Sequence, residues 1–399
     1  MKSLHLAVFR SDIILARPWM AEQFEESIAN KEDELRRKIL WAVAAVIIGL
    51  VILRISCPAV SHHLPFGPSS RTLLAQGVDA FDLSHDGKRI AIISGGKLQG
   101  INVDGSMNRE HPNAVLAKPG YTSAEICWSL DDLKIAATIC YPNDTSFIRI
   151  IDVNSGTTQE IAKAFALGNP VWLEDGKRLA WIQREDYSKS HRASIYVWRD
   201  GSRTTEIYGD EPANFFWLKM IPRNDSMGFI HIIHSDSAGR EPGEPFSRLE
   251  IIQDNGTRPR SIPAPPGQFP IPFRGFMCWD ISQDAKMIAY AYGWSIWLTG
   301  SAQGDNPIEL GKYAALEIKW SPDGRRIGFV TTSPKSVRKR SSGRGQKVIS
   351  PPHELHVINK DGSGHRLVCT EPQGIKSIEW LNNNEVLYLS GKDLYKRGL

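Results

Sequence analysis

A ten-residue pattern recurs along most of this chain and restricts the folds that it can adopt. The clearest copy, residues 320–329, reads WSPDGRRIGF. In each copy an apolar strand ends near a serine, an aspartate-containing turn follows, and alternating apolar residues begin a second strand. The other good copies are LSHDGKRIAI (83–92), WSLDDLKIAA (128–137), WLEDGKRLAW (172–181) and ISQDAKMIAY (281–290), and degenerate copies lie at 217–229 and 380–388. Such self-similarity indicates a repeat architecture.

Each copy predicts a β-hairpin, because Asp-Gly dipeptides tolerate the positive φ of tight turns. A second hairpin signal follows about ten to twenty residues later in nearly every copy. These signals are INVDGS (101–106), IIDVNSG (150–156), VWRDGS (197–202), IIQDNGT (251–257), WLTGSAQG (297–304) and VINKDGS (357–363). Each repeat therefore supplies four short antiparallel strands, which is one blade of a β-propeller.

The blade count follows from the length of the repeat region, residues 71–399. Seven blades give about 47 residues each and six give about 55, against about 40–45 for blades of this kind. We therefore predict an all-β, seven-bladed propeller, with six blades as the alternative. Residues 392–396 resemble a third strand without a fourth, and residues 71–75 resemble a lone fourth strand. We expect these two segments to pair and close the ring.

The W-S-x-D-G-K-x-I-A-F type of repeat resembles the TolB-like, WD40-like β-propeller repeat. The resemblance covers residues 71–399 and implies a propeller that binds other proteins. The chain differs from TolB, which has an α/β domain before its propeller and no transmembrane anchor. It also differs from prolyl-oligopeptidase-like peptidases, because no hydrolase domain follows the repeats. The resemblance therefore implies the fold and a general habit of protein binding, but not the partners of TolB.

Residues 39–53, ILWAVAAVIIGLVIL, form an uninterrupted apolar run between Lys38 and Arg54. A run of this length, with basic ends that can snorkel, is at the short limit for a membrane span. We predict a cytoplasmic segment with a juxtamembrane helix at 1–38, a transmembrane helix at 39–54, a linker at 55–70 and the propeller at 71–399. A cleaved signal peptide and a buried globular helix are the alternatives. The true start of the protein could be Met20.

The charges that flank the apolar run predict its orientation. Four cations precede it closely and only Arg54 follows it before Arg71, which places the N-terminus in the cytoplasm. We therefore expect a single-pass membrane protein with an extracytoplasmic propeller, periplasmic if the source is Gram-negative.

The net charge is +4, and the stretch 335–347 alone supplies six cations, so the rest of the chain is near neutral. This balance argues against a nucleic-acid-binding surface.

The sequence carries no motif that we recognise as catalytic. It lacks a G-x-S-x-G elbow and a P-loop, and HELH at 353–356 is one residue short of a metalloprotease motif. We predict no catalytic residue, metal or cofactor.

The repeated aspartates and the repeated tryptophans are interpreted as structural. The aspartates are expected in turns and the tryptophans between blades. These residues are Asp86, Asp131, Asp175, Asp284 and Asp323, and Trp128, Trp172, Trp320 and Trp380. Five cysteines do not form a disulfide scaffold and are interpreted mainly as free thiols.

Long insertions indicate the working surface. In a four-stranded blade, second-to-third loops and blade-to-blade connections lie on one face of the ring. The long segments 184–192, 234–247, 262–275 and 333–352 all belong to that set. Candidate binding residues on this face are Lys335, Arg338, Lys339, Arg340, Arg344, Lys347, Phe273, Arg274, Tyr187 and His191.

The function that these features predict is a membrane-anchored, non-catalytic protein-interaction scaffold in the cell envelope. Its partner would be an envelope protein or an anionic surface, such as lipid headgroups or a charged polymer, bound through the basic stretch. The alternative is a propeller enzyme or a carbohydrate-binding module with a site at the mouth of the central channel.

Overall fold

The computed structural model describes residues 71–399 with internal gaps. These gaps are 109–113, 143–144, 186–191, 201–203, 211–212, 222–225, 234–246, 258, 267–275, 303–304 and 334–350. The predicted cytoplasmic segment, transmembrane helix and linker, residues 1–70, lie outside the described residues. In the part of the chain that is described, we find no helix with the length and apolar character of a membrane span.

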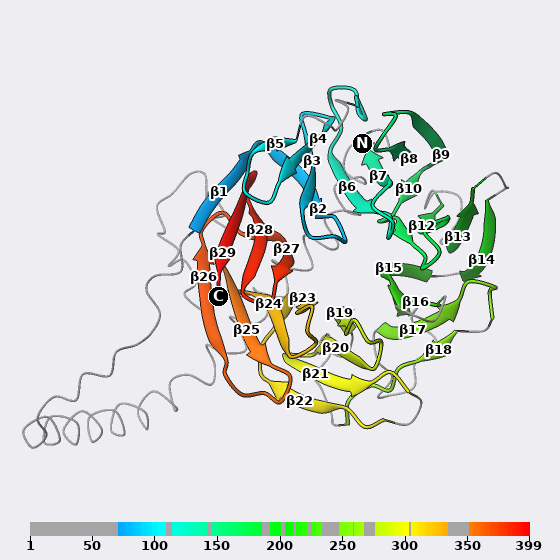
Figure 1. Cartoon of the computed structure of the whole chain (residues 1–399). Helices are drawn as coiled ribbons and strands as arrows, with labels where there is room; N and C mark the ends of the chain where they lie inside the picture. Colours follow the sequence, from blue (N-terminus) through cyan, green and yellow to red (C-terminus); the bar gives the residue numbers. More distant parts are fainter. Residues whose placement is uncertain are drawn as a thin grey trace, which may run out of the picture. The chain divides into compact units, whose positions relative to one another are not determined.

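The described residues form seven antiparallel sheets arranged as the blades of a propeller (Figure 1). Blade 1 contains β2 (Val78–Leu83), β3 (Arg89–Ser94), β4 (Lys97–Asn102) and β5 (Met107–Asn108). Blade 2 contains β6 (Ser123–Trp128), β7 (Lys134–Cys140), β8 (Ser146–Asp152) and β9 (Thr158–Ala164). Blade 3 contains β10 (Ala166–Leu167), β11 (Val171–Trp172), β12 (Arg178–Arg184), β13 (Ala193–Arg199) and β14 (Thr205–Asp210).

The remaining blades repeat the same order of strands. Blade 4 contains β15 (Ala213–Ile221), β16 (Ser226–Ile233), β17 (Ser247–Gln253) and β18 (Arg260–Ser261). Blade 5 contains β19 (Phe276–Ile281), β20 (Met287–Tyr292), β21 (Ser295–Gly300) and β22 (Ile308–Gly311). Blade 6 contains β23 (Ala315–Trp320), β24 (Arg326–Thr332), β25 (His353–Asn359) and β26 (Arg366–Glu371). The predicted seven blades are confirmed, and the six-bladed alternative is wrong.

Blade 7 is built from both ends of the propeller. Its strands β27 (Ile375–Asn382), β28 (Glu385–Ser390) and β29 (Asp393–Gly398) come from the C-terminus, and β1 (Arg71–Gln76) supplies the outer strand. β1 pairs antiparallel with β29, with Arg71 opposite Arg397 and Gln76 opposite Asp393. The predicted closure of the ring is confirmed. Figure 1 shows the blue first strand completing the red blade.

The core lies between the blades, where apolar faces of neighbouring sheets meet. One cluster joins Ala289 and Ile296 of blade 5 to Ile318 and Phe329 of blade 6. Two glycines allow particularly close packing: a Cβ added at Gly228 would lie 2.4 Å from the Trp279 ring. A Cβ at Gly328 would lie 3.3 Å from the Trp380 indole. The repeat therefore places small residues where an indole of the next blade must fit.

The closing strand offers a matched test of how much its apolar contacts contribute. Leu74 is 9% exposed and packs with blade 1 and blade 7 residues, whereas its neighbour Leu73 is 46% exposed. We expect Leu74→Ala to lower the free energy of unfolding by about 2–5 kcal/mol, because it leaves a cavity at the seam. Leu73→Ala should change it by less than about 0.5 kcal/mol. Chemical denaturation of both variants measures the difference, and equal effects would contradict this account of the seam.

Candidate functional site

All ten residues that the sequence singles out for binding lie outside the described residues. They are Tyr187, His191, Phe273, Arg274, Lys335, Arg338, Lys339, Arg340, Arg344 and Lys347. The structure does show which strand ends their segments join. The segments after β12, β16 and β24 each lead from the second to the third strand of a blade, and the segment after β18 leads to the next blade. In an antiparallel blade these ends lie on one face, which we call the loop face.

The opposite face, which we call the turn face, carries the repeated aspartates. In blade 6, the Ser321 hydroxyl donates to Asp323 Oδ1 at 2.6 Å and the Arg325 amide donates to the same oxygen at 3.0 Å. Burial by itself would raise the pKa of Asp323, but these two hydrogen bonds lower it overall. The same Ser–Asp contact recurs at Asp86, Asp131 and Asp284. The structural role predicted for these aspartates is confirmed.

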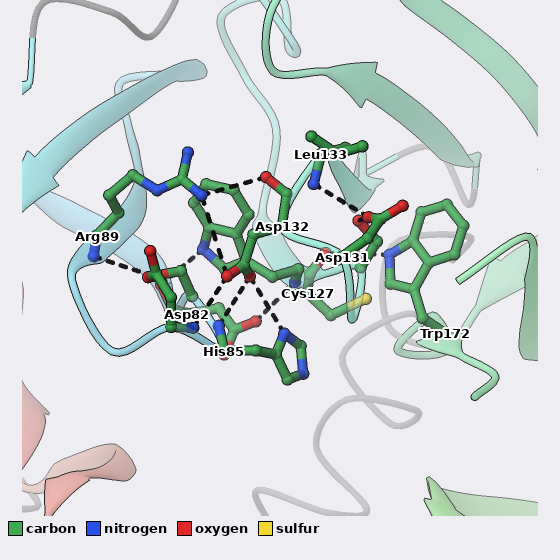
Figure 2. Close-up of polar contacts among 12 residues, drawn as sticks. Asp82, His85, Arg89, Cys127, Asp131, Asp132, Leu133 and Trp172 are labelled. Carbon is green, nitrogen blue, oxygen red and sulfur yellow. Dashed lines mark hydrogen bonds and ion pairs between the residues drawn. The ribbon is translucent and has the colours of Figure 1, made fainter. Parts of the chain in front are cut away.

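One turn residue reaches into the neighbouring blade. Asp132 occupies the positive-φ position (φ 56°) that glycine takes in most other copies. Its carboxylate accepts hydrogen bonds from the backbone amides of His85 at 2.8 Å and Asp86 at 2.9 Å, as Figure 2 shows. Arg89 of blade 1 donates to the Asp132 carbonyl oxygen at 3.3 Å. These contacts tie the first turns of blades 1 and 2 together.

The repeated tryptophans link blades 2, 3, 6 and 7 to the blade before each of them. Each indole N–H donates to the carbonyl oxygen of a first-strand residue in the preceding blade. The donors and acceptors are Trp128 to Asp82 (3.2 Å), Trp172 to Cys127 (3.3 Å), Trp320 to Asp280 (3.3 Å) and Trp380 to Lys319 (3.1 Å). The four indoles are buried. Their predicted position between blades is confirmed.

Five blades carry a charged residue at the strand position whose carbonyl oxygen accepts the tryptophan hydrogen bond in other blades or in the same one. Lys219, Asp280, Lys319, Glu379 and Asp82 lie near the ends of the first strands of five successive blades, 4, 5, 6, 7 and 1. We call these five residues, with Glu317 two positions before Lys319, the axial ring. Figure 1 shows that β15, β19, β23, β27 and β2 are the innermost strands of their blades.

Ion pairs cross the blade boundaries of the axial ring. Lys219 Nζ lies 2.8 Å from Asp280 Oδ1, and Lys319 is paired with Glu379. The Trp320 amide donates to the other Asp280 oxygen at 2.7 Å. The carboxylates of Glu379, Asp280 and Glu317 raise the pKa of the Lys319 ammonium, although burial alone would lower it. These charges thus favour the charged form of the Lys319 ammonium.

Two carboxylates of the axial ring are left without a cation of their own. Asp82 accepts a hydrogen bond from the Trp128 amide at 2.8 Å, but burial and the nearby Glu379 carboxylate raise its pKa to about 7. Burial likewise raises the pKa of Glu317 to about 7, against the opposing effect of Lys319. The axial ring thus contains four carboxylates and two ammonium groups, and the raised pKa values of Asp82 and Glu317 favour their protonated forms.

The sequence analysis did not identify the axial ring. The sequence does contain a signal for these charges. Lys319 and Glu379 each immediately precede a repeat tryptophan, whereas the apolar Val171 precedes Trp172. A charged side chain that recurs at the same position of successive inner strands marks a residue that must find a partner in another blade.

The histidines of the HELH stretch and two of the cysteines lie in well-defined surroundings. Among the described residues, no three His, Cys, Asp or Glu side chains form a group that could hold a metal ion. His353 of the HELH stretch accepts from the Ile375 amide at 2.9 Å, and His356 points to Thr331, at 3.2 Å. Burial raises the pKa of the Cys369 thiol to about 11, and that of Cys127 well above its usual range. The four described cysteines, Cys127, Cys140, Cys278 and Cys369, form no disulfide with one another.

The sequence matches no protein-family model and no curated protein. Solved structures do resemble it. An oligogalacturonate lyase in complex with manganese superposes with a TM-score of 0.54 at 15% identity, over 83% of this chain and 90% of that one. The β-propeller domain of Cps50 (Swd1) from Myceliophteria thermophila superposes with a TM-score of 0.54 at 10% identity, over 83% of this chain and 100% of that one.

A putative TolB from Agrobacterium tumefaciens is less similar, with a TM-score of 0.40 at 14% identity over 81% of this chain and 91% of that one. The shared feature is the β-propeller fold. At these identities the likeness extends to the fold alone. The structure with manganese is a lyase and the Cps50 (Swd1) domain is not described as an enzyme, so the fold by itself does not assign an activity.

The axial ring makes a prediction about stability and pH. The carboxyl of Asp82 has a pKa of about 7 when folded, against an ordinary value of 3.8, so its ionisation costs stability increasingly from about pH 4 to about pH 7. Asp82→Asn removes that charge and keeps an oxygen for the Trp128 amide. We expect its melting temperature to exceed that of the wild type by about 2–4 °C at pH 8 and by much less at pH 5.

Asp280→Asn is the matched control, because it alters the same repeat position but removes the partner of Lys219. It should lower the melting temperature at pH 8. Scanning fluorimetry of both variants at the two pH values measures the contrast. If both substitutions shift the melting temperature in the same direction at pH 8, the charge account of the axial ring is wrong.

Proposed function

We propose that this chain is a membrane-anchored, non-catalytic interaction scaffold that displays its propeller outside the cytoplasm and binds partners on the loop face. The observation that carries the proposal is that the long segments between strands all join strand ends on one face of the propeller. Segments 185–192, 234–246, 262–275 and 333–352 all join strand ends on the loop face. On the turn face, the first turns of blades 1, 2, 5 and 6 are closed by their own Ser–Asp hydrogen bonds.

The anchoring part of the proposal rests on residues 39–54 and the basic residues before them. The test is protease protection on intact cells or spheroplasts, with an epitope tag at each end. We expect the protein in the membrane fraction, with a cleavable C-terminal tag and a protected N-terminal tag. A soluble protein, or a C-terminal tag that resists protease, would overturn the proposed topology without affecting the fold.

The loop-face part of the proposal is tested by photo-crosslinking in cells. A photoreactive residue is placed in turn within 262–275 and 333–352, and at the exposed turn-face positions Lys88, Lys177 and Arg325 as matched controls. We expect specific adducts from the loop-face positions and none from the turn face. Equal adduct yields from both faces, or adducts from the turn face alone, would refute a loop-face partner.

The six cations of the basic stretch are tested in the same experiment. Neutralising Lys335, Arg338, Lys339, Arg340, Arg344 and Lys347 should reduce the loop-face adducts if the partner or surface is anionic. An unchanged yield would leave the loop face as the binding surface but remove the basic stretch from it.

A second candidate is an enzyme or a carbohydrate-binding module at the propeller axis. It is favoured by the pKa values near 7 of Asp82 and Glu317, since groups that exchange protons near neutral pH occur often in active sites. The ion pairs of Lys219 and Lys319 favour the structural interpretation, because they use the ring's own charges. Adducts at the loop face that are unaffected by Asp82→Asn would favour the scaffold.

A further inference from the structure

Four aromatic rings stack between blade 6 and the chain segment that enters it from blade 5. Phe329 of β24 lies parallel to His356 of β25, with ring centroids 5.2 Å apart and an interplanar angle of 14°. His365, in the turn before β26, stacks on His356 at 5.2 Å and 21°. Tyr313, in the segment between β22 and β23, covers His365 at 4.6 Å. The two imidazoles thus connect an exposed turn to the segment between the blades.

The two histidines are in direct contact through their ring nitrogens. His365 Nε2 lies 3.2 Å from His356 Nδ1, so one nitrogen donates a hydrogen and the other accepts it. His356 is buried and His365 is exposed. This contact requires that at least one of the two facing nitrogens carries no proton.

The groups that face the pair come from three elements. From β25, Glu354 Oε2 lies 3.3 Å from His356 Nε2. From β24, the Thr331 hydroxyl lies 3.2 Å from the same nitrogen, and Phe329 supplies an apolar ring. From the segment between the blades, Tyr313 supplies its aromatic ring. The one carboxylate in this set lies beside the buried histidine, and no described cation contacts the pair.

We propose that the His356–His365 pair is an acid-released latch, which holds the turn 360–365 and Tyr313 against blade 6 while the facing nitrogens share one hydrogen. When both imidazoles are protonated, two N–H groups and two positive charges face each other across the contact. His356 then stays beside the Glu354 carboxylate, and the exposed His365 moves into solvent and uncovers Tyr313.

The direction of the pH dependence follows from the surroundings of the pair. Partial loss of hydration at the exposed His365 lowers its pKa, and burial together with the charge of His365 lowers the pKa of His356, although Glu354 opposes this. A histidine with a lowered pKa in the folded state stabilises the contact fully above its ordinary pKa of about 6.5. That stabilisation is lost as the pH falls further. The latch is therefore closed at neutral pH and opens on mild acidification.

Hydrogen–deuterium exchange of the full chain at pH 7.5 and pH 5.5, corrected for the intrinsic rates, tests the latch. In the wild type we expect the peptides that cover 311–316 and 360–368 to exchange several-fold faster at pH 5.5, while a peptide from β20 remains unchanged. His365→Gln keeps a neutral hydrogen-bonding group and should abolish the difference between the two pH values. His365→Ala loses the contact and should exchange fast at both.

Histidine 85 provides the matched control, because it is a half-exposed histidine on the turn face that contacts Asp132 instead of a second imidazole. His85→Gln should keep the wild-type response. A wild type with equal exchange at both pH values, or a His365→Gln variant that still responds to pH, would overturn the latch. An acid response shared by the β20 peptide would also overturn it, because the effect would then belong to the whole propeller.

Discussion

The contact on which the whole ring depends is the one between an indole and the preceding blade. The N–H of Trp320, for example, bonds to the Asp280 carbonyl of blade 5, while its ring is buried against the neighbouring sheet. A single blade cannot bury such a side chain, so no blade is stable alone. The stacking of blades must then continue until the last blade meets the first. The closing pair β1–β29 is the consequence, since it leaves no unfinished blade.

Closure of the ring brings the charged side chains of the axial ring together, and most of these charges are paired. Closing the ring brings the ends of the innermost strands near one another and partly away from water. Two ion pairs across blade boundaries, Lys219–Asp280 and Lys319–Glu379, neutralise part of this charge. Among the described residues, Asp82 and Glu317 form no ion pair, and burial raises the pKa of each to about 7. The latch that we propose for the histidine pair of blade 6 is a second contact that depends on the number of protons.

The local structure was readable from the sequence because its causes are local. The Ser-x-Asp-Gly segment of blade 6 closes its own turn through contacts between residues two to five positions apart, so residues 321–326 contain all the information for that hairpin. The axial ring and the histidine stack were not readable in this way. Lys319 and Glu379 are 60 positions apart, and nothing within either strand indicates that the two side chains meet.

The sequence by itself determined the repeat, the hairpins, the seven blades and the pairing of the two ends, because turn chemistry and alternating burial are encoded over short spans. It also separated tight turns on one face from long segments on the other. Only the tertiary structure decided which charges meet at the axis and that His356 faces His365. Those neighbours are set by the angle between successive blades and the closure of the ring, and no short stretch of sequence encodes either.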